Sequence, residues 1–444
     1  MARLSQPPPV DHGSALGPGA SALAHPVPAG MRDLLPPEAA RHAELGRRIV
    51  RAFELCAYEL VTVPLFEFAE VVERGLGALE SHEVLRFVEP ESGAVVSLRP
   101  DMTPQVARLL ATRLSEAPAP ARLCYQGSVL RRRHERARRH RQIPQAGIEL
   151  LGSSGPEGDL EVLSVAVAAL RASGLKDFVI DLGHARIAAA LVEPLASADA
   201  REVLDALEVK DETEVVRRAE RHGLGARELR ALAELPSLHG AGDVWPRAER
   251  VLKGTQAESA LLELRNLWEA AGSAGLSSGI LVDLGETRDF AYYTGALFQI
   301  HAEGPGRALG AGGRYDGLLE RFGAARPAVG FAFGLDDVAW ALEHAGRVPN
   351  LPAKLLLTAS ASGLVEALRS AGLAAALAPS GDPLAYARAW RYSHVVEAQS
   401  GGLRLTEVES SHSETIAAPA ADWVSLLSDR VAPGGSGKDK ACLP

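Results

Sequence analysis

Cysteine is scarce in this chain: Cys56, Cys124 and Cys442 are the only three in 444 residues. Their spacing fits neither a zinc site nor a redox pair, which argues against a cysteine-metal centre and a disulfide scaffold. A sparse, odd-numbered set of thiols is typical of a reducing compartment, so we predict a cytoplasmic protein. No motif in the sequence predicts a bound cofactor or metal ion.

Long apolar runs are also missing. There is no run of 18 apolar residues, and residues 1–25 lack the basic start and apolar core of a signal peptide, so neither a transmembrane helix nor secretion is predicted. Positive charge is not in excess either, because 47 Lys and Arg face 56 Asp and Glu, which gives a net charge of −9. This balance argues against general nucleic-acid binding, although one local cluster is basic.

The basic cluster lies within the most informative stretch, residues 122–152. Two strand-like runs flank a loop at 131–141 that holds seven arginines, two histidines and one glutamate. In the second run Gln145, Gly147 and Glu149 alternate with apolar residues, which predicts a strand with one buried face. Gln145 and Glu149 would lie about 13 Å apart and reach both ends of a small polar ligand over Gly147, where no side chain intrudes. The alternative is a solvated strand face beside a solvated charge run.

Two further segments combine polar groups with a helix start or a turn. Thr103 is predicted to cap a helix that begins at Pro104, which would expose the oxygens of Asp101 and Thr103. These residues are either simple caps or ligands for an ammonium group. The glycine-rich segment 310–317 either lets a ligand approach the backbone closely or is an ordinary turn.

Changes of periodicity divide the chain into parts. We expect tails without structure at 1–25 and 431–444, a helical insertion without strands at 186–272, and a small α/β domain at 352–430. The segments 26–185 and 273–345 together form one core. Within that core the patterns predict helices at 37–57, 159–173 and 335–344 and strands at 60–64, 85–88, 94–98, 177–182, 279–284, 292–301 and 327–334.

Separated motifs, in order along the chain, support a family resemblance. They are Gly30 to Pro36, Arg141 to Glu149, Arg288 with Tyr292 to Gly295, and Gly312 to Gly317. Together they resemble the catalytic core of histidyl-tRNA synthetases, which are class II aminoacyl-tRNA synthetases, over about residues 26–345. The resemblance implies an α+β fold with an antiparallel sheet flanked by helices, and a dimer formed through the helix at 37–57 and the segment around Pro64.

The same resemblance implies roles in binding free histidine. The expected histidine ligands are Asp101, Thr103 and Gln145 for the α-ammonium group, Arg288 for the carboxylate, and Glu149 and Tyr292, with Tyr293 beside them, for the imidazole. A guanidinium matches a carboxylate with two parallel hydrogen bonds, and a carboxylate accepts from an imidazole N–H. Arg131 falls where the synthetases bind the α-phosphate of ATP, and Arg139 and Arg141 are further candidates for contact with an anion or nucleotide.

The departures from the synthetase pattern concern charge. Arg133 stands in place of a glutamate, Ala291 in place of an aspartate, and Asp337 in place of the arginine that holds the γ-phosphate of ATP. A carboxylate at position 337 would repel a triphosphate. Because adenylate formation depends on charge arranged around phosphates, these changes argue against it.

Residues 98–103 and 292–295 are similar instead to the regulatory subunits of ATP phosphoribosyltransferase, a paralogous family without aminoacylation. This resemblance implies a non-catalytic chain, a homodimer within a hetero-oligomer with the short catalytic subunit, acting in the first step of histidine biosynthesis and in its feedback regulation by histidine. The α/β domain at 352–430 resembles the anticodon-binding domain of the synthetases, so a histidine–tRNA ligase is the alternative. A tRNA-binding module is a third interpretation, but the mixed charge of that domain argues against it.

Overall fold

The computed structural model describes residues 27–76, 84–132, 140–276, 279–287 and 292–431. The chain forms two compact units, Met1–Arg347 and Val348–Pro444. The tails predicted at 1–25 and 431–444 lie, apart from Val431, outside the described residues. Within the described ranges no helix is long and apolar enough to cross a membrane.

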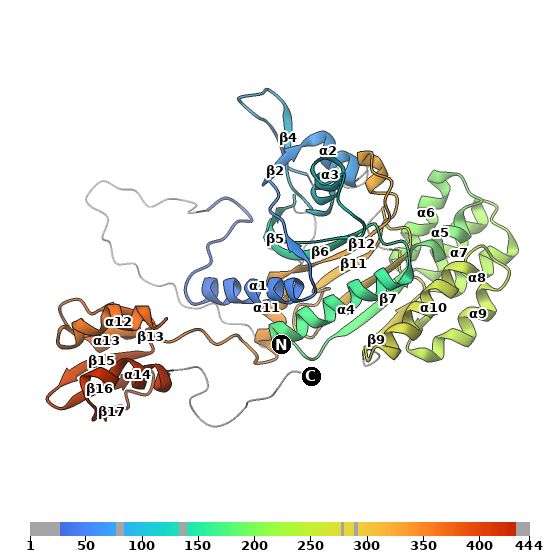
Figure 1. Cartoon of the computed structure of the whole chain (residues 1–444). Helices are drawn as coiled ribbons and strands as arrows, with labels where there is room; N and C mark the ends of the chain where they lie inside the picture. The colour runs from blue at the N-terminus through green and yellow to red at the C-terminus, as the bar shows by residue number, and fades with distance from the viewer. Residues whose placement is uncertain (1–26, 77–83, 133–139, 277–278, 288–291, 432–444) are drawn as a thin grey trace. The chain divides into compact units, whose positions relative to one another are not determined.

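A sheet of nine strands, counted over the described residues, forms the centre of the first unit (Figure 1). Pairs β1–β5 and β7–β9 are parallel and the other pairs are antiparallel, so the predicted antiparallel sheet is in fact mixed. In spatial order the strands are β1 (Glu59–Leu60), β5 (Ala121–Leu130), β6 (Gln142–Leu151), β12 (Ala328–Gly334), β11 (Gly310–Arg314), β10 (Ala296–His301), β7 (Val179–His184), β9 (Ile280–Asp283) and β8 (His239–Gly240).

Helices α1 (Glu38–Leu55), α4 (Pro156–Ser173) and α11 (Leu335–His344) pack on one face of this sheet. Leu45, Ile49 and Phe53 recur at helical spacing on α1 and are buried. The Phe53 ring meets the Phe331 ring of β12 edge to face, 5.7 Å between centroids. The apolar stripe of α1 is therefore covered within the chain and gives no support to a dimer interface.

The opposite face of β5 and β6 carries a second core. Helix α3 (Thr103–Arg113) contributes Val106 and Leu110 to it, and β5 contributes Tyr125. Alternate residues of β6, such as Ile148, enter the first core instead. The alternative of a solvated strand face therefore does not hold for β6, because Gly147 and Glu149 are buried as well.

A small sheet and a helix lie beside α3. The sheet has the order β2 (Phe66–Phe68), β4 (Val95–Leu98), β3 (Arg86–Val88), and helix α2 (Ala69–Leu76) follows β2. The hairpin predicted at 85–98 is thus confirmed. One 3-10 turn, η4 (Leu319–Phe322), packs against both α3 and α2.

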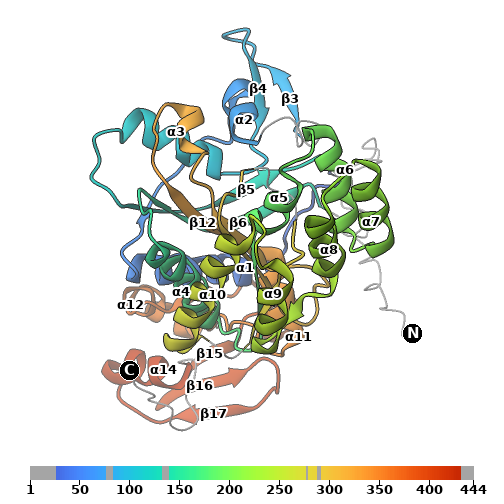
Figure 2. The same cartoon turned by 90° about the vertical axis from the view of Figure 1, so that its right-hand side faces the viewer.

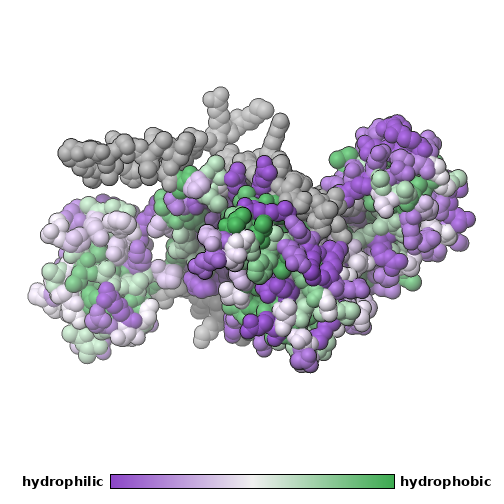
Figure 3. Space-filling view, turned by 90° about the horizontal axis from the view of Figure 1, so that it is seen from above, coloured by the Kyte–Doolittle hydropathy of each residue, from purple (hydrophilic) through white to green (hydrophobic). Residues whose placement is uncertain are grey.

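Exposed apolar side chains gather on and around this small sheet. Seen from above, apolar residues are visible among polar neighbours near the middle of the face (Figure 3). Phe66, Phe68 and Phe87 share one face of the small sheet, because Phe68 and Phe87 both pair with Val96 and Phe66 lies two residues before Phe68. Their relative exposures are 40% to 56%. We call these three residues the apolar patch.

The helical insertion follows β7 (Figure 2). Its helices are α5 (Ala185–Val192), α6 (Ser197–Glu208), α7 (Glu212–Arg221), α8 (Ala226–Glu234), α9 (Trp245–Leu252) and α10 (Glu258–Ser273), with 3-10 turns η2 (Leu235–Ser237) and η3 (Gly242–Val244). The insertion was predicted to contain no strand, but β8 pairs with β9 and extends the central sheet.

Two predicted strands are shorter in the structure. In the segment 60–64, strand pairing ends after Leu60. Pro64, at the end of this segment, has no N–H and cannot donate a ladder hydrogen bond. The strand predicted at 292–301 begins only at Ala296 as β10. Tyr292 and Tyr293 precede it in a turn and pack both rings against the second core, which breaks the alternation of a strand.

The second unit is a small α/β domain. Its five strands, within the described residues, have the order β14 (Ala374–Leu377), β13 (Lys354–Leu357), β15 (His394–Gln399), β16 (Gly402–Glu407), β17 (Ser413–Ile416). Its helices are η5 (Ala359–Leu364), α12 (Val365–Ser370), α13 (Pro383–Ala389), η6 (Ala420–Asp422) and α14 (Trp423–Val431).

Candidate ligand-binding site

Strand β6 places Gln145, Gly147 and Glu149 on the face that carries the second core. Gly147 is paired with Tyr125 on β5 and with Ala332 on β12. Residues paired across a sheet project to the same side, so Tyr125 stands beside Glu149 on that face. This register defines the floor of the candidate site.

Glu149 is the most deeply enclosed polar group of the site, with 1% of its surface exposed. Its Oε1 accepts hydrogen bonds from the hydroxyls of Thr103 at 2.7 Å and Tyr125 at 3.1 Å. Its Oε2 accepts from the hydroxyl of Tyr315. A carboxylate has about four lone-pair sites, so three hydroxyls leave one for a ligand N–H.

Burial raises the pKa of Glu149 well above its usual range, and the nearby charge of Asp101 acts in the same direction. The hydrogen bonds from Thr103 and Tyr125 oppose this effect, because they stabilise the charged form. A cationic or strongly donating ligand group beside Glu149 would favour the carboxylate further. The site therefore suits a ligand that carries N–H donors.

The space over Gly147 is not open as the sequence predicted. A Cβ atom built on Gly147 would lie 2.7 Å from the Tyr125 hydroxyl and 2.4 Å from the Phe331 carbonyl oxygen. Glycine is needed here because the Tyr125 ring crosses this position. A ligand that joins Gln145 to Glu149 would have to lie over the tyrosine or displace it.

The predicted helix cap at Thr103 is also wrong. Helix α3 starts after Met102, and the Thr103 side chain makes no capping bond, because its hydroxyl donates to Glu149. The cap-like acceptor is Asp101, whose Oδ1 accepts from the Thr103 backbone N–H at 3.2 Å. The other carboxylate oxygen, Oδ2, accepts from the Tyr292 hydroxyl at 3.4 Å.

Tyrosines close one side of the site. The rings of Tyr292, Tyr293 and Tyr315 pack together with centroids 5.1 to 6.4 Å apart. Tyr125 and Tyr315 were not among the predicted ligands. The signal for Tyr125 was its position on the neighbouring strand, and Tyr315 lies within the glycine-rich segment already singled out. That segment is β11 followed by a turn that begins at Asp316, so the interpretation as an ordinary turn holds for its end.

The structure thus brings together five of the predicted residues: Asp101, Thr103, Glu149, Tyr292 and Tyr293. Gln145 lies four positions from Glu149 on the same strand, and its amide oxygen is buried without a hydrogen-bond partner in the described part of the chain. A buried acceptor that lacks a donor is costly unless a ligand or water supplies one. Arg288 lies outside the described residues.

The arginine-rich loop is described only at its two ends. The Arg131 Nε donates to the Pro100 carbonyl oxygen at 2.9 Å, and the Arg131 backbone N–H donates to the Arg141 carbonyl. The Arg141 backbone N–H donates in turn to Gly30, which ties the N-terminal segment to the base of the loop. Arg133 and Arg139 lie outside the described residues, as does Ala291.

Asp337 is not an open carboxylate. It is 2% exposed, and its Oδ1 accepts from the Arg307 Nε at 2.7 Å. The neighbouring Asp336 accepts from Arg32 at 2.7 Å. Arg307 therefore weakens the repulsion of a triphosphate that the sequence predicted. Its ion pair with Asp337 nevertheless fills position 337, where the synthetases have an arginine.

Fold and site together define a protein of the histidyl-tRNA synthetase class. A family model described as histidyl-tRNA synthetase matches residues 30–338. The solved histidyl-tRNA synthetase of Nostoc sp. PCC 7120 shares the fold, with a TM-score of 0.75, 19% identity, and coverage of 92% of this chain and 100% of that one.

Within this class, the chain belongs to the family of ATP phosphoribosyltransferase regulatory subunits. The regulatory subunit of Anaeromyxobacter sp. (strain Fw109-5) is 44% identical over 330 residues, 74% of this chain and 96% of that protein. That of Syntrophotalea carbinolica is 34% identical over 409 residues, 89% of this chain and 96% of that protein. A crystal structure described as an ATP phosphoribosyltransferase regulatory subunit/histidyl-tRNA synthetase from Bacillus halodurans C has a TM-score of 0.74 at 26% identity, covering 85% of this chain and 98% of that one.

The match to the Syntrophotalea protein also bears on the α/β domain. Its 409 aligned residues exceed the length of the core at 26–345, so the alignment extends into the C-terminal region. A regulatory-subunit relative thus shares part of that region. The presence of the domain is therefore compatible with membership of the regulatory family.

Proposed function

We propose that this chain is the non-catalytic regulatory subunit of a cytoplasmic ATP phosphoribosyltransferase complex, in which it binds free histidine and transmits feedback inhibition of the first step of histidine biosynthesis. The observation that carries the proposal is the buried Glu149 site in a chain of the regulatory family. Its acceptors match the N–H groups of histidine.

The proposed ligands of histidine follow the contacts in the site. Asp101, Thr103 and Gln145 offer acceptors to the α-ammonium group, and the Gln145 amide oxygen has no other described donor. Glu149, with Tyr292 and Tyr293 beside it, faces the imidazole. Arg288 is proposed for the ligand carboxylate on the family resemblance alone.

The partner is proposed to be a short-form catalytic chain of ATP phosphoribosyltransferase. A chain without chemistry of its own acts through different contacts with two states of its partner. Histidine binding and assembly must then affect each other's free energy equally, as long as the coupling acts on binding. The experiment is to mix both purified chains from the same organism and follow complex formation and turnover with and without histidine.

We expect a stable hetero-oligomer, higher turnover than that of the catalytic chain alone, and a decrease of turnover when histidine is added. If the two chains elute separately at low salt and the catalytic chain is fully active alone, the proposal is wrong.

Neutralising Arg132, Arg136 and Arg138 tests whether the arginine-rich loop contacts the partner. Rim charges chiefly affect the association rate and its salt dependence, so both should fall while the fold is unchanged.

A histidine–tRNA ligase is the second candidate, favoured by the family model over residues 30–338 and by the C-terminal α/β domain. The test is histidine-dependent exchange of pyrophosphate into ATP by the purified protein. We expect none, because an internal ion pair fills the position of Asp337. Asp337→Arg alone should not restore exchange, since Arg133 and Ala291 also differ from the synthetase pattern. Exchange by the unmodified chain would make the ligase the better interpretation.

The homodimer is proposed to form through the apolar patch rather than through α1. The three members of the patch are exposed in the single chain, whereas the apolar stripe of α1 is already buried. Burying an apolar surface of this kind is the usual driving force for a twofold dimer.

A further inference from the structure

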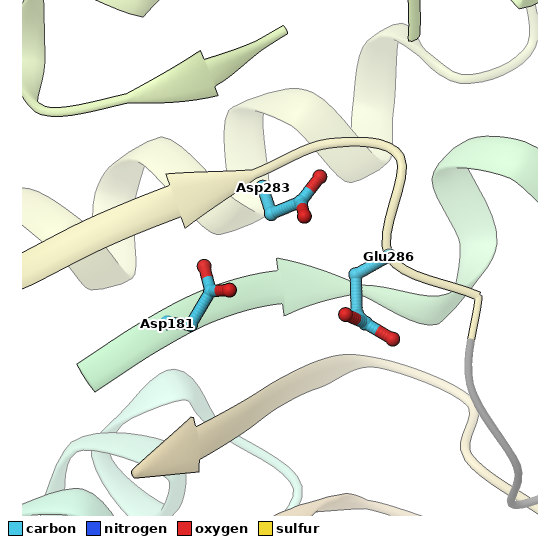
Figure 4. A group of neighbouring side chains, drawn as sticks. All are labelled: Asp181, Asp283 and Glu286. Atoms are coloured by element: carbon cyan, nitrogen blue, oxygen red, sulfur yellow. The ribbon is translucent and has the colours of Figure 1, made fainter. Parts of the chain in front are cut away.

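One cluster of charged side chains joins the helical insertion to the central sheet. Asp181 on β7, Asp283 at the end of β9 and Glu286 after it place carboxylate oxygens within 4.8 Å of one another, and Figure 4 shows the three side chains converging. Groups of the chain itself engage both Asp283 oxygens, because Oδ2 accepts from the Lys210 ammonium group and Oδ1 from the Gly285 N–H at 3.0 Å. This cluster therefore gives no support to a metal site.

A second cluster is centred on Arg314, the buried last residue of β11. Its guanidinium reaches the start of α4, where Nε donates to both carboxylate oxygens of Asp159 at 3.0 and 3.1 Å. The Nη1 donates to the Ser153 carbonyl at 2.8 Å and to Asp316 at 3.1 Å, and the Nη2 donates to the Gly155 carbonyl at 3.0 Å. The guanidinium thus binds the end of β11 to the segment that connects β6 to α4.

Packing alone does not require a cation at this position. The side chains of Arg314 and Asp159 are only 9% and 12% exposed, and replacing such an enclosed ion pair by apolar residues of similar volume is often neutral or stabilising. What the guanidinium adds is direction, because its planar fork holds several acceptors at fixed angles. The contacts of Arg314 therefore determine where the end of β11 lies.

The residue after Arg314 reaches the candidate site on the opposite face of the sheet. Neighbouring residues of an extended chain point to opposite faces, so Tyr315 enters the second core while Arg314 turns to α4. The Tyr315 hydroxyl donates to Glu149 over β12, the strand that lies between β6 and β11. Gly330 of β12 leaves room for this bond, since a Cβ atom there would lie 2.7 Å from the Tyr315 hydroxyl.

We propose that Arg314 is a positioning residue for the histidine site: its guanidinium fixes the end of β11 on α4 and thereby holds the Tyr315 hydroxyl on Glu149. This inference rests on the proposed function for its readout on histidine. Because one peptide bond separates the two residues, a shift of the Arg314 backbone displaces the Tyr315 side chain directly. Glu149 then loses a donor that fixes the direction of its carboxylate, and a binding site whose groups are not held in place binds its ligand more weakly.

The test combines Arg314→Met and Tyr315→Phe in a double-mutant cycle, with histidine affinity measured by calorimetry on the full chain. We expect each single variant to bind histidine about tenfold more weakly, which corresponds to the loss of one hydrogen bond to a charged group. Because Arg314 acts through Tyr315, the double variant should bind no more weakly than the weaker single variant. Independent effects would instead multiply to about a hundredfold.

Arg326→Met is the matched control. The Arg326 guanidinium also donates to two backbone carbonyls, but they belong to Ser115 and Ala117 and not to the start of α4. This variant should bind histidine like the wild type. Arg314→Lys keeps the charge opposite Asp159, but a single ammonium group lacks the fork that holds the carbonyls as well, so its affinity should lie between those of the wild type and Arg314→Met. If Arg314→Met does not fold, Arg314→Lys takes its place in the cycle.

Fluorine NMR of the chain labelled with fluorotyrosine reports the position of Tyr315 without histidine. The chain has seven tyrosines, and the resonance that is missing from Tyr315→Phe is that of Tyr315. It should move in Arg314→Met and stay in place in Arg326→Met. Wild-type affinity in Arg314→Met, independent losses in the double variant, or an unmoved Tyr315 resonance would each overturn the inference. If the wild type itself does not bind histidine, the proposed function fails, and the Tyr315 resonance still decides on Arg314.

Discussion

The Asp337 carboxylate of α11 and the Arg307 guanidinium of the β10–β11 connection form an ion pair, with Nε and Oδ1 2.7 Å apart. Asp336 and Arg32 form a second pair one residue earlier on the helix. Both aspartates lie in the first turn of α11, where the helix dipole favours negative charge. The chain's own carboxylates therefore occupy the end of the helix where a phosphate would have to compete with them.

Replacing Asp337 by Asn should destabilise the first unit, because Arg307 would keep its charge beside a neutral, buried amide. Breaking a buried pair by removing one partner typically costs about 3 to 5 kcal/mol. Because Arg307 is partly exposed, we expect the free energy of unfolding to fall by about 3 kcal/mol. Urea denaturation measures this free energy of unfolding. Glu303→Gln is the control, since Glu303 lies in the same connection but is 93% exposed in its contact with His344.

Glu149→Ala should abolish detectable histidine binding or weaken it severely. Truncating one member of a buried, hydrogen-bonded charge pair costs about 2 to 5 kcal/mol in binding. Calorimetry should show a smaller loss of histidine-binding free energy for Gln145→Ala than for Glu149→Ala, because the Gln145 side chain offers only a neutral acceptor. Unchanged affinity in both variants would place the histidine site elsewhere.

His184 should make the stability of the chain depend on pH. Its Nδ1 accepts from the Arg186 N–H and caps α5, and its Nε2 lies 3.2 Å from Glu263. Burial lowers the pKa of His184 below 6.5, although the charge of Glu263 opposes this. A histidine with a lowered folded-state pKa contributes stability that is present above pH 6.5 and is lost as the pH falls below it, because the unfolded chain then binds more protons.

The expected loss between about pH 7.5 and about pH 5 is near 1 kcal/mol, the usual contribution of an N-cap side chain. It is measured as the difference in unfolding free energy between wild type and His184→Asn. Asparagine keeps a capping acceptor but does not titrate. Parallel pH profiles of the two proteins would show that His184 is not responsible.

Phe68→Glu should convert the proposed homodimer into a monomer at micromolar concentration. Phe68 is 56% exposed and lies in the apolar patch, so a charge there would remain buried and unpaired in the interface. Sedimentation velocity gives the oligomeric state. Leu262→Glu serves as the control on α10, where a large apolar residue is exposed outside the patch. A wild type that sediments as a monomer would rule out the dimer altogether.

The sequence was sufficient to predict the helices and strands that frame the site, because local patterns determine them. The alternation of Gln145, Gly147 and Glu149 predicted β6, and helical spacing predicted α1 and α11. The family resemblance was also sufficient to select Asp101, Thr103 and Tyr292, which lie together in the structure. These are features of short segments whose order along the chain matches a known family.

The contacts between distant segments could not be predicted in the same way. Thr103 has the sequence of a helix cap, and only the position of Glu149, 46 residues away, shows that its hydroxyl is engaged elsewhere. The same holds for Tyr125, since the register of β5 against β6 decides that its ring crosses Gly147. From the sequence alone, Asp337 was expected to repel a triphosphate, because its partner Arg307 lies 30 residues earlier and their pairing is not visible in a local pattern.

The three hydroxyls around Glu149 come from residues 24, 46 and 166 positions away along the chain. Contacts of long sequence separation form late, because a large loop must close before they are made. Tyr315 follows the whole helical insertion in the sequence, so its contact with Glu149 can form only after the insertion has been synthesised. The three hydroxyls proposed to surround a ligand at Glu149 are therefore all present only after residue 315 has been synthesised.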